Sequence, residues 1–260
     1  MNFLNVVRQV GKRFVKATPI LRRHILPSTD YRVLAGIDDA RAAANSSNGW
    51  SAARTVSRQE RAYRGLIAVM KDGNPRLDLQ IAAEAVAATG LSHPRLLEIG
   101  CGSGYYSEVL ATLLPGGVSY TGIDFSEAMI ARAREYYPAI AFEVADATKL
   151  PYADQDFDIA FNGVSLMHIL DYQVAIREAA RVARFCIFHS VPVFDNHRTT
   201  YLSKYAYGSP VVEVVFGKPE LMSICSDAGL RLMREWPGIA YDVHEATGHH
   251  SSAVTYLFAR

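Results

Sequence analysis

The chain has 260 residues, half of them hydrophobic, and a formal net charge of +1 at pH 7. These values fit one large α/β domain, or one domain with an appendage, and exclude a chain too polar to build a core. No apolar run reaches the ~18 residues of a membrane span. The three cysteines, Cys101, Cys186 and Cys225, are scattered and match neither a disulfide framework nor a zinc pattern. They predict a reducing compartment, the cytoplasm.

Residues 1–90 are expected to form a helical extension or cap. Residues 2–16 place apolar side chains at helical spacing with basic residues between them, and no acidic residue precedes Asp30. Such a basic amphipathic helix can contact the anionic inner surface of a membrane, pack on the main domain, or belong to a cleaved transit peptide. The sequence is compatible with all three interpretations.

Two further helices are expected before residue 90. Ser57 is the predicted N-cap of a helix over residues 58–71, because Glu60 follows at capping-box spacing. A second helix is expected over residues 77–88, closed by Gly90. Residues 40–50 are small and polar, and they predict a loop.

From residue 95 onward, strand and helix patterns alternate along the chain. Strands are expected at 96–99, 118–123, 140–144, 157–162 and 185–189, and helices at 103–114, 127–136 and 172–183. Ser126 is the predicted N-cap of the helix over 127–136. This alternation predicts a doubly wound, Rossmann-like sheet of mostly parallel strands. Ligands of such sheets bind at the carboxyl ends of the strands.

The last part of the chain contains one irregular stretch. Residues 190–217 form a longer connection than usual, so an insertion that acts as a binding loop or lid is expected within a domain over residues 91–260. A helix over 218–228 and two closing strands, 230–236 and 253–259, should follow. The segment between those strands should be a loop.

Three glycines at alternate positions, Gly100, Gly102 and Gly104, follow the first strand of the main domain and precede a helix. Glycine allows tight backbone angles and close approach of a ligand, and the helix N-terminus supplies free N–H groups. The spacing differs from the dinucleotide fingerprint, and the Gly-Lys-Ser/Thr of a phosphate loop is absent. An acidic residue, Glu98, lies two positions before the first glycine.

The pattern Glu98-x-Gly100-x-Gly102-x-Gly104 resembles motif I of the class I S-adenosylmethionine (SAM) dependent methyltransferases. Residues 121–129 resemble the second motif, Asp146-Ala147 the third, and residues 150–158 the run that leads into the fourth strand. These four matches occur in the family's order. The resemblance implies a seven-stranded sheet with an antiparallel last strand, SAM as cofactor and S-adenosylhomocysteine as product.

The resemblance also implies roles for individual residues. Asp124 would accept hydrogen bonds from the ribose hydroxyls, and Phe125 or Met129 would pack on the adenine. Asp146 would accept from the adenine amino group, while Glu98 would orient the glycine loop or reach the methionyl amine through water. The candidate cofactor-binding residues are Glu98, Gly100, Cys101, Gly102, Gly104, Asp124, Phe125, Met129, Asp146, Ala147 and Asn162.

The acceptor side is predicted less sharply. His168 and His189 are the candidate catalytic residues, as general bases for an oxygen acceptor, or they are histidines that pin the rim of the sheet. Trp50 and Tyr63 are candidate substrate-binding residues, although aromatic residues on a helix stripe are commonly core. No metal site is predicted, since the histidines of Gly248-His-His have no acid or thiol at ligand spacing.

Asn162 continues as Gly-Val-Ser, which departs from the Pro-Pro-Tyr of enzymes that methylate amino groups of nucleic acids and glutamine. A weaker resemblance, at residues 49–50, 188–192 and 204–208, links the chain to methyltransferases of bacterial surface-polysaccharide gene clusters. A small-molecule acceptor is therefore expected, with an oxygen of a sugar or polysaccharide intermediate favoured and no nucleic acid. The alternatives are a nucleic-acid methyltransferase and a SAM-binding regulatory protein without turnover.

Overall fold

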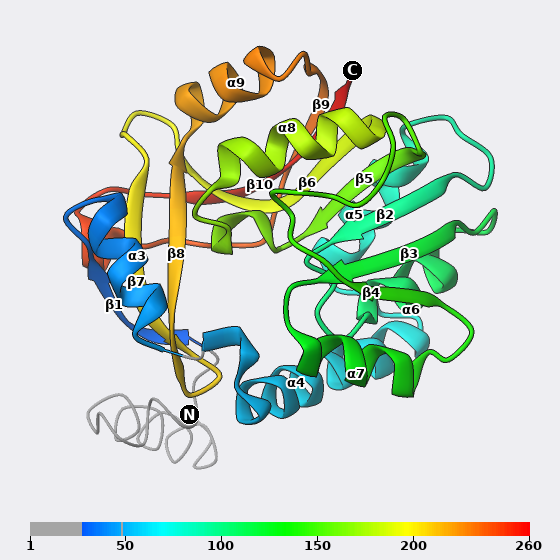
Figure 1. The fold of residues 1–260 in the computed structure, drawn as a ribbon, viewed down its shortest axis with the longest axis horizontal. Helices are drawn as coiled ribbons and strands as arrows, with labels where there is room; N and C mark the ends of the chain where they lie inside the picture. Colours follow the sequence, from blue (N-terminus) through cyan, green and yellow to red (C-terminus); the bar gives the residue numbers. More distant parts are fainter. Residues whose placement is uncertain (1–27, 48) are drawn as a thin grey trace, which may run out of the picture.

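The computed structural model describes residues 28–47 and 49–260, so the predicted basic helix over residues 2–16 lies outside the described residues (Figure 1). The described residues include a sheet of ten strands, with the order β1-β7-β8-β6-β5-β2-β3-β4, and with β10 pairing β6 and β9. The strands are β1 (Ser28–Val33), β2 (Arg95–Ile99), β3 (Ser119–Asp124), β4 (Ala141–Val144), β5 (Phe157–Gly163), β6 (Ala183–Phe194), β7 (Thr200–Ala206), β8 (Ser209–Gly217), β9 (Arg231–Pro237) and β10 (Ser252–Ala259).

Helices cover both faces of the central strands (Figure 1). Side chains of helices α8 and α9 pack on one face, and side chains of α4, α5 and α6 contribute to the core on the other face. The α-helices are α3 (Ile37–Asn45), α4 (Ala53–Lys71), α5 (Leu77–Ala87), α6 (Tyr105–Leu113), α7 (Glu127–Tyr136), α8 (Tyr172–Val182), α9 (Lys218–Asp227) and α10 (His244–Thr247), and the 3-10 helices are η1 (Gly49–Ser51) and η2 (Leu166–His168).

Seven of the strands confirm the predicted doubly wound fold. Strands β4, β3, β2, β5 and β6 are parallel, β10 is antiparallel to β6, and β9 is antiparallel to β10. Leu96 and Leu97 of β2 point to opposite faces of the sheet, and both are fully buried. This explains the unbroken apolar run before the glycines, because a central parallel strand is covered on both sides.

Residues 190–217, expected to be an irregular binding loop or lid, are mostly β-structure, so the expected irregularity is wrong, while their being an insertion stays a prediction. Strand β6 continues to Phe194, and β7 and β8 form an antiparallel hairpin whose second strand pairs with the end of β6. The hairpin turns at Tyr207 and Gly208, both with positive φ (51° and 83°), as a two-residue turn between paired strands requires. A tyrosine at the first turn position hides this signal in the sequence.

The N-terminal extension is not purely helical, because β1 pairs antiparallel with β7 and extends the same sheet. Helix α3 covers residues 40–45, which were expected to be a loop. Helix α4 begins at Ala53, so Ser57 is not its N-cap, and Glu60 pairs with Arg132 of α7 instead of completing a capping box. The domain boundary at residue 90 stays a prediction.

Other local signals are confirmed. Ser126 caps α7 by accepting a hydrogen bond from Met129 N at 3.3 Å. Helix α5 ends with Gly90 nearby at positive φ, and β9 and β10 close the sheet as expected, with the short helix α10 between them. Within the described ranges, no helix is both long and apolar enough to cross a bilayer.

Candidate active site

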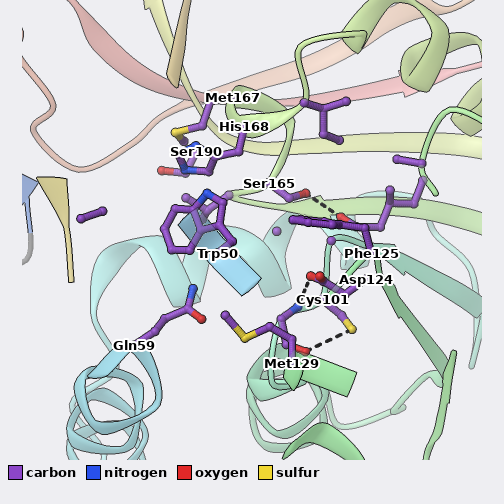
Figure 2. A pocket seen from close by; sticks show the side chains of 18 of the residues that line it. Trp50, Gln59, Cys101, Asp124, Phe125, Met129, Ser165, Met167, His168 and Ser190 are labelled. Carbon is purple, nitrogen blue, oxygen red and sulfur yellow. Dashed lines mark hydrogen bonds between the residues drawn. The ribbon is translucent and has the colours of Figure 1, made fainter. Parts of the chain in front are cut away.

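A cavity of about 460 Å³ lies at the carboxyl ends of β2, β3, β4 and β5. In Figure 2, Asp124, Cys101 and Met129 lie on one side of it, and Trp50 and His168 lie on the other. We call these sides the glycine-loop half and the hairpin half, because β7 and β8 border the second. Parallel strands bring their carboxyl ends to one edge of the sheet, so residues far apart in sequence meet here.

The glycine loop lines the cavity with backbone. Gly100 N and Cys101 N both donate to Ile123 O at 2.8 Å, which ties the loop to the end of β3. Gly100 has φ +76°, and a Cβ there would lie 2.8 Å from Ser165 Oγ. A Cβ on Gly102 would meet nothing nearer than Gln59 Oε1, at 3.6 Å. Gly100 therefore serves close packing, whereas Gly102 leaves open space beside the loop.

Asp124 fixes the loop from the end of β3. Its Oδ2 accepts from Gly102 N and its Oδ1 accepts from Ser126 N, both at 2.9 Å. The side chain is only 8% exposed, and burial raises the pKa of its carboxyl group although the two N–H donors oppose this. Each carboxylate oxygen retains a second lone pair, so the group can accept further hydrogen bonds from a ligand.

Next to Asp124, the cavity wall becomes apolar and then polar again. Phe125 is 60% exposed at the cavity, an uncommon state for a large apolar ring, and Met129 is buried beside the glycine loop. After β4, Asp146 Oδ1 accepts from Thr148 N and Thr148 Oγ1 at 2.8 Å, and Ala147 also lines the wall. The ends of β3 and β4 thus offer a flat apolar surface between two carboxylates.

Three predicted cofactor-binding residues do not line the cavity. Glu98 is fully buried, accepts a hydrogen bond from Tyr120 OH, and has a pKa raised well above its ordinary value by burial. Gly104 starts α6 at positive φ, where a Cβ would lie 2.6 Å from Phe142 Cζ. Asn162 is buried and donates to Ser165 Oγ at 3.3 Å. In this structure these residues support the wall from behind.

His168 lines the hairpin half of the cavity, as the sequence suggested. Its Nδ1 lies 2.9 Å from Val212 O, and a carbonyl oxygen only accepts, so Nδ1 carries the hydrogen and Nε2 has the lone pair. Burial, with the charge of Lys204, lowers the pKa of His168 to about 3. The imidazole is therefore neutral at pH 7 and able to accept a proton at Nε2.

His189 does not reach the cavity. It was expected to end a strand at the rim, but β6 runs five residues further, to Phe194, which leaves His189 within the strand and 1% exposed. Its Nδ1 lies 2.9 Å from Thr255 Oγ1, and its ring stacks on Phe161. Burial lowers its pKa to about 4. This position fits a histidine that ties β6 to β10.

Both candidate substrate-binding aromatic residues line the cavity. The Trp50 ring lies beside the His168 ring (Figure 2), with centroids 4.7 Å apart. Its centroid is 6.2 Å from that of the Tyr207 ring. Tyr63 stacks on Tyr105, with centroids 3.7 Å apart and an interplanar angle of 11°. The cavity therefore presents several flat faces opposite the glycine loop.

Several residues of the hairpin half were not predicted from the sequence. Lys204 and Tyr207 come from β7 and its turn, and Arg76 and Asp78 form an ion pair at the start of α5. Leu202, Lys204 and Ala206 are buried at alternate positions of β7, but the lysine among them hides this alternation in the sequence. Among the described residues, no group of three or more metal-ligating side chains is suited to a metal ion.

Comparison with known proteins identifies the central part of the chain. Residues 97–185 match the family described as "Methyltransferase domain". The chain is 38% identical over 123 residues to the 27-O-demethylrifamycin SV methyltransferase of Amycolatopsis mediterranei, an alignment that covers 45% of this chain and 43% of that protein. It is 29% identical over 163 residues to the demethylmenaquinone methyltransferase of Beutenbergia cavernae, with 58% and 64% covered.

Solved structures show the same fold. The [4+2]-cyclase SpnF superposes with a TM-score of 0.55 at 18% identity, covering 70% of this chain and 81% of that one. A SAM-dependent methyltransferase from Clostridium acetobutylicum superposes with 0.52 at 12% identity, covering 77% and 98%. The chain spans about half the length of the curated relatives it matches. Residues 97–185 thus match a methyltransferase domain, within a chain that shares the fold of a SAM-dependent methyltransferase.

Proposed function

We propose that this protein is an enzyme that transfers a methyl group from SAM to an oxygen of a small-molecule acceptor, with a sugar or polysaccharide intermediate as the favoured class. The observation that carries the proposal is Asp124. Its carboxylate stands at the cavity, held by Gly102 N and Ser126 N, with lone pairs left for a diol. A carboxylate at the end of the second parallel strand is the group that binds a ribose in folds of this type.

The surrounding residues suit the rest of the cofactor. Phe125 and Met129 would pack on the adenine, Asp146 and Ala147 would contact its edge, and the backbone at Gly102 leaves room for the amino-acid part. Bound SAM supplies an electrophilic methyl group on a sulfonium ion. Asp124 and Asp146, which have no cationic partner among the described residues, favour a ligand of positive charge, and no phosphate-binding cation is needed.

His168 is proposed as the group that takes the acceptor's proton. Its Nε2 has the lone pair, because Nδ1 donates to Val212 O. As a hydroxyl oxygen forms its new bond to carbon, it gains positive charge, so its proton becomes strongly acidic and a weak base is sufficient to remove it. A pKa of about 3 also keeps His168 unprotonated throughout the physiological range.

Trp50 and Tyr63 would position the acceptor. Rigid aromatic faces bind flat or ring-shaped groups at little cost in conformational entropy, and alignment of acceptor and donor supplies much of the rate of a methyl transfer. The Trp50 ring lies beside His168, so an acceptor packed on it would bring a hydroxyl toward Nε2.

The proposal is tested with radiolabelled SAM and a panel of acceptors: neutral glycosides, nucleotide sugars, lipid-linked sugars, hydroxyquinones and RNA. Transfer of label to an oxygen of a glycoside or lipid-linked sugar is the expected result. Transfer only to RNA, with binding that weakens steeply as salt rises, would instead support a nucleic-acid methyltransferase. SAM binding without transfer to any acceptor would support the regulatory alternative.

Contact with the inner membrane surface, one of the three interpretations of residues 2–16, depends on a segment that lies outside the described residues. Co-sedimentation of the full chain with anionic and with neutral vesicles tests this contact. Binding to anionic vesicles that is lost at high salt is expected for a basic helix.

A further inference from the structure

The hairpin half of the cavity contains a buried ion pair that the proposed reaction does not use. Lys204 of β7 lines the cavity and bonds Glu213 of β8. The two residues lie diagonally across the hairpin, since Lys204 pairs with Val211 in the register, and they occupy the same face. Lys204 is 7% exposed and Glu213 is fully buried. A buried ion pair is a costly feature that calls for a role.

The ammonium group of Lys204 has donors to spare. It carries three N–H groups, and the hydrogen bonds within the described chain give it one acceptor, Glu213. Its remaining neighbours are aromatic: the rings of Tyr31 and Tyr241 lie 5.5 and 5.9 Å from Nζ. Burial lowers the pKa of Lys204, but the Glu213 carboxylate more than offsets this, so the group stays charged. Lys204 thus offers charged hydrogen-bond donors at the wall of the cavity.

The charges of the cavity restrict what those donors can bind. Among the described residues, the cavity wall has two permanently cationic side chains, Lys204 and Arg76, and each already has a carboxylate partner. Of the other carboxylates on the wall, Asp171 pairs with Arg41, whereas Asp124 and Asp146, in the opposite half, have no cation bonded to them among the described residues. The wall therefore has no uncompensated positive charge, and an anionic group entering it would meet a net negative field.

We propose that Lys204, neutralised by Glu213, is a specificity-determining residue that binds an uncharged oxygen of the acceptor, a hydroxyl, ether or carbonyl, and that this subsite selects uncharged over anionic acceptors. The inference rests on the proposed function and narrows its acceptor class. Within sugars, it favours neutral glycosides over uronic acids at the group that enters the cavity. An oxygen hydrogen-bonded to Lys204 would also orient the acceptor, because Trp50 and His168 border the same hairpin.

The test compares phenyl β-glucoside with phenyl β-glucuronide, which differ by one carboxylate, by calorimetry on the full chain saturated with S-adenosylhomocysteine. The glucoside is expected to bind at least about tenfold more tightly than the glucuronide. A tenfold difference corresponds to the free energy of one hydrogen bond from a charged donor such as Lys204. Equal or tighter binding of the glucuronide would overturn the inference, and so would the failure of both to bind.

A double variant separates binding from folding. Lys204→Met alone would leave a buried, uncompensated carboxylate, so the pair is removed together as Lys204→Met/Glu213→Leu, a change that proteins commonly tolerate. The double variant should bind the glucoside about tenfold more weakly, with SAM affinity unchanged. Wild-type glucoside affinity in the double variant would contradict the role of Lys204.

The outcomes also distinguish this inference from the proposed function. Loss of the glycoside preference with intact methyl transfer would refute the role of Lys204 and leave the enzyme assignment standing. Discrimination between the two glycosides without methyl transfer would support the role of Lys204 and refute the enzyme assignment.

Discussion

The two halves of the cavity are built in different ways. The glycine-loop half comes from three short segments at the ends of parallel strands, namely Gly100–Ser103 after β2, Asp124 and Phe125 at β3, and 145–148 after β4, together with Met129 of α7. The hairpin half comes from β1, η1, α4, the start of α5, η2 and β7, which are dispersed along the chain. The first half depends on local turns, and the second depends on long-range strand pairing.

They also differ in the atoms that they present. The glycine-loop half uses backbone groups held by Asp124, so its shape depends on φ angles and close packing. The hairpin half uses aromatic rings, an imidazole and two ion pairs. Substitutions in the first half should therefore affect SAM binding, and those in the second should affect acceptor binding or turnover.

The strongest effect is expected from Gly100→Ala. The new Cβ would lie 2.8 Å from Ser165 Oγ at a φ of +76°, so the loop must move or unfold. We expect loss of detectable SAM binding and a loss of stability of about 2 kcal/mol. Calorimetry and thermal melting measure both. Gly116→Ala is the matched control, since its Cβ would meet nothing within 4 Å. Normal SAM binding by Gly100→Ala would contradict the claim that SAM binding depends on close packing in the glycine-loop half.

Asp124→Ala should weaken SAM binding about 100-fold, because it removes the acceptor of Gly102 N together with the proposed acceptor of the ribose hydroxyls. Glu127→Gln, an exposed change three residues away on α7, controls for general effects. Unchanged SAM affinity in Asp124→Ala, measured by calorimetry, would refute the assignment of the glycine-loop half.

His168→Gln tests whether the hairpin half affects turnover without affecting SAM binding. We expect kcat to fall about 100-fold, because general-base catalysis is lost, while SAM affinity stays the same. The wild-type rate should show no ionisation of His168 between pH 5 and 8, given its pKa of about 3. His93→Gln, at an exposed histidine outside the cavity, is the control. A parallel loss of SAM affinity and kcat would mean that the halves are not separable.

The smallest expected effect per residue is that of each buried histidine on stability in acid. The folded pKa values of His168 and His189, about 3 and 4, lie below the ordinary 6.5, so below pH 6.5 the unfolded chain binds protons that the folded chain does not. Stability should fall as pH drops from 6.5 to 4.5, on the order of 2 kcal/mol per histidine. Urea unfolding of wild type and His168→Gln at both pH values measures this. An equal loss in both proteins would contradict the lowered pKa of His168.

The glycine-loop half could be predicted from the sequence because its determinants are local. A strand, a glycine turn and a helix cap each depend on neighbouring residues, so Gly100, Asp124 and Ser126 were identified together. Glu98 is an exception, because it was predicted to bind the cofactor but does not line the cavity. Its spacing from Gly100 is correct, but strand alternation turns its side chain away from the cavity to Tyr120.

Trp50, Tyr63 and His168 of the hairpin half were predicted from the sequence, but the residues that its strands contribute were not, because their positions depend on which strands pair. Lys204 becomes a cavity residue only when β7 pairs with β8 and β1. His189 was misplaced because the end of β6 is set by its pairing with β8 and β10, which continues past the end of β5. Ser57 has a capping-box neighbour, but η1 precedes α4 directly and the helix begins earlier.

Calorimetric titration of the full chain with SAM and, separately, with NAD tests whether the glycine loop forms the SAM-binding site of a methyltransferase. We expect saturable SAM binding that Asp124→Ala weakens about 100-fold, and no NAD binding. Binding of NAD without binding of SAM would contradict it.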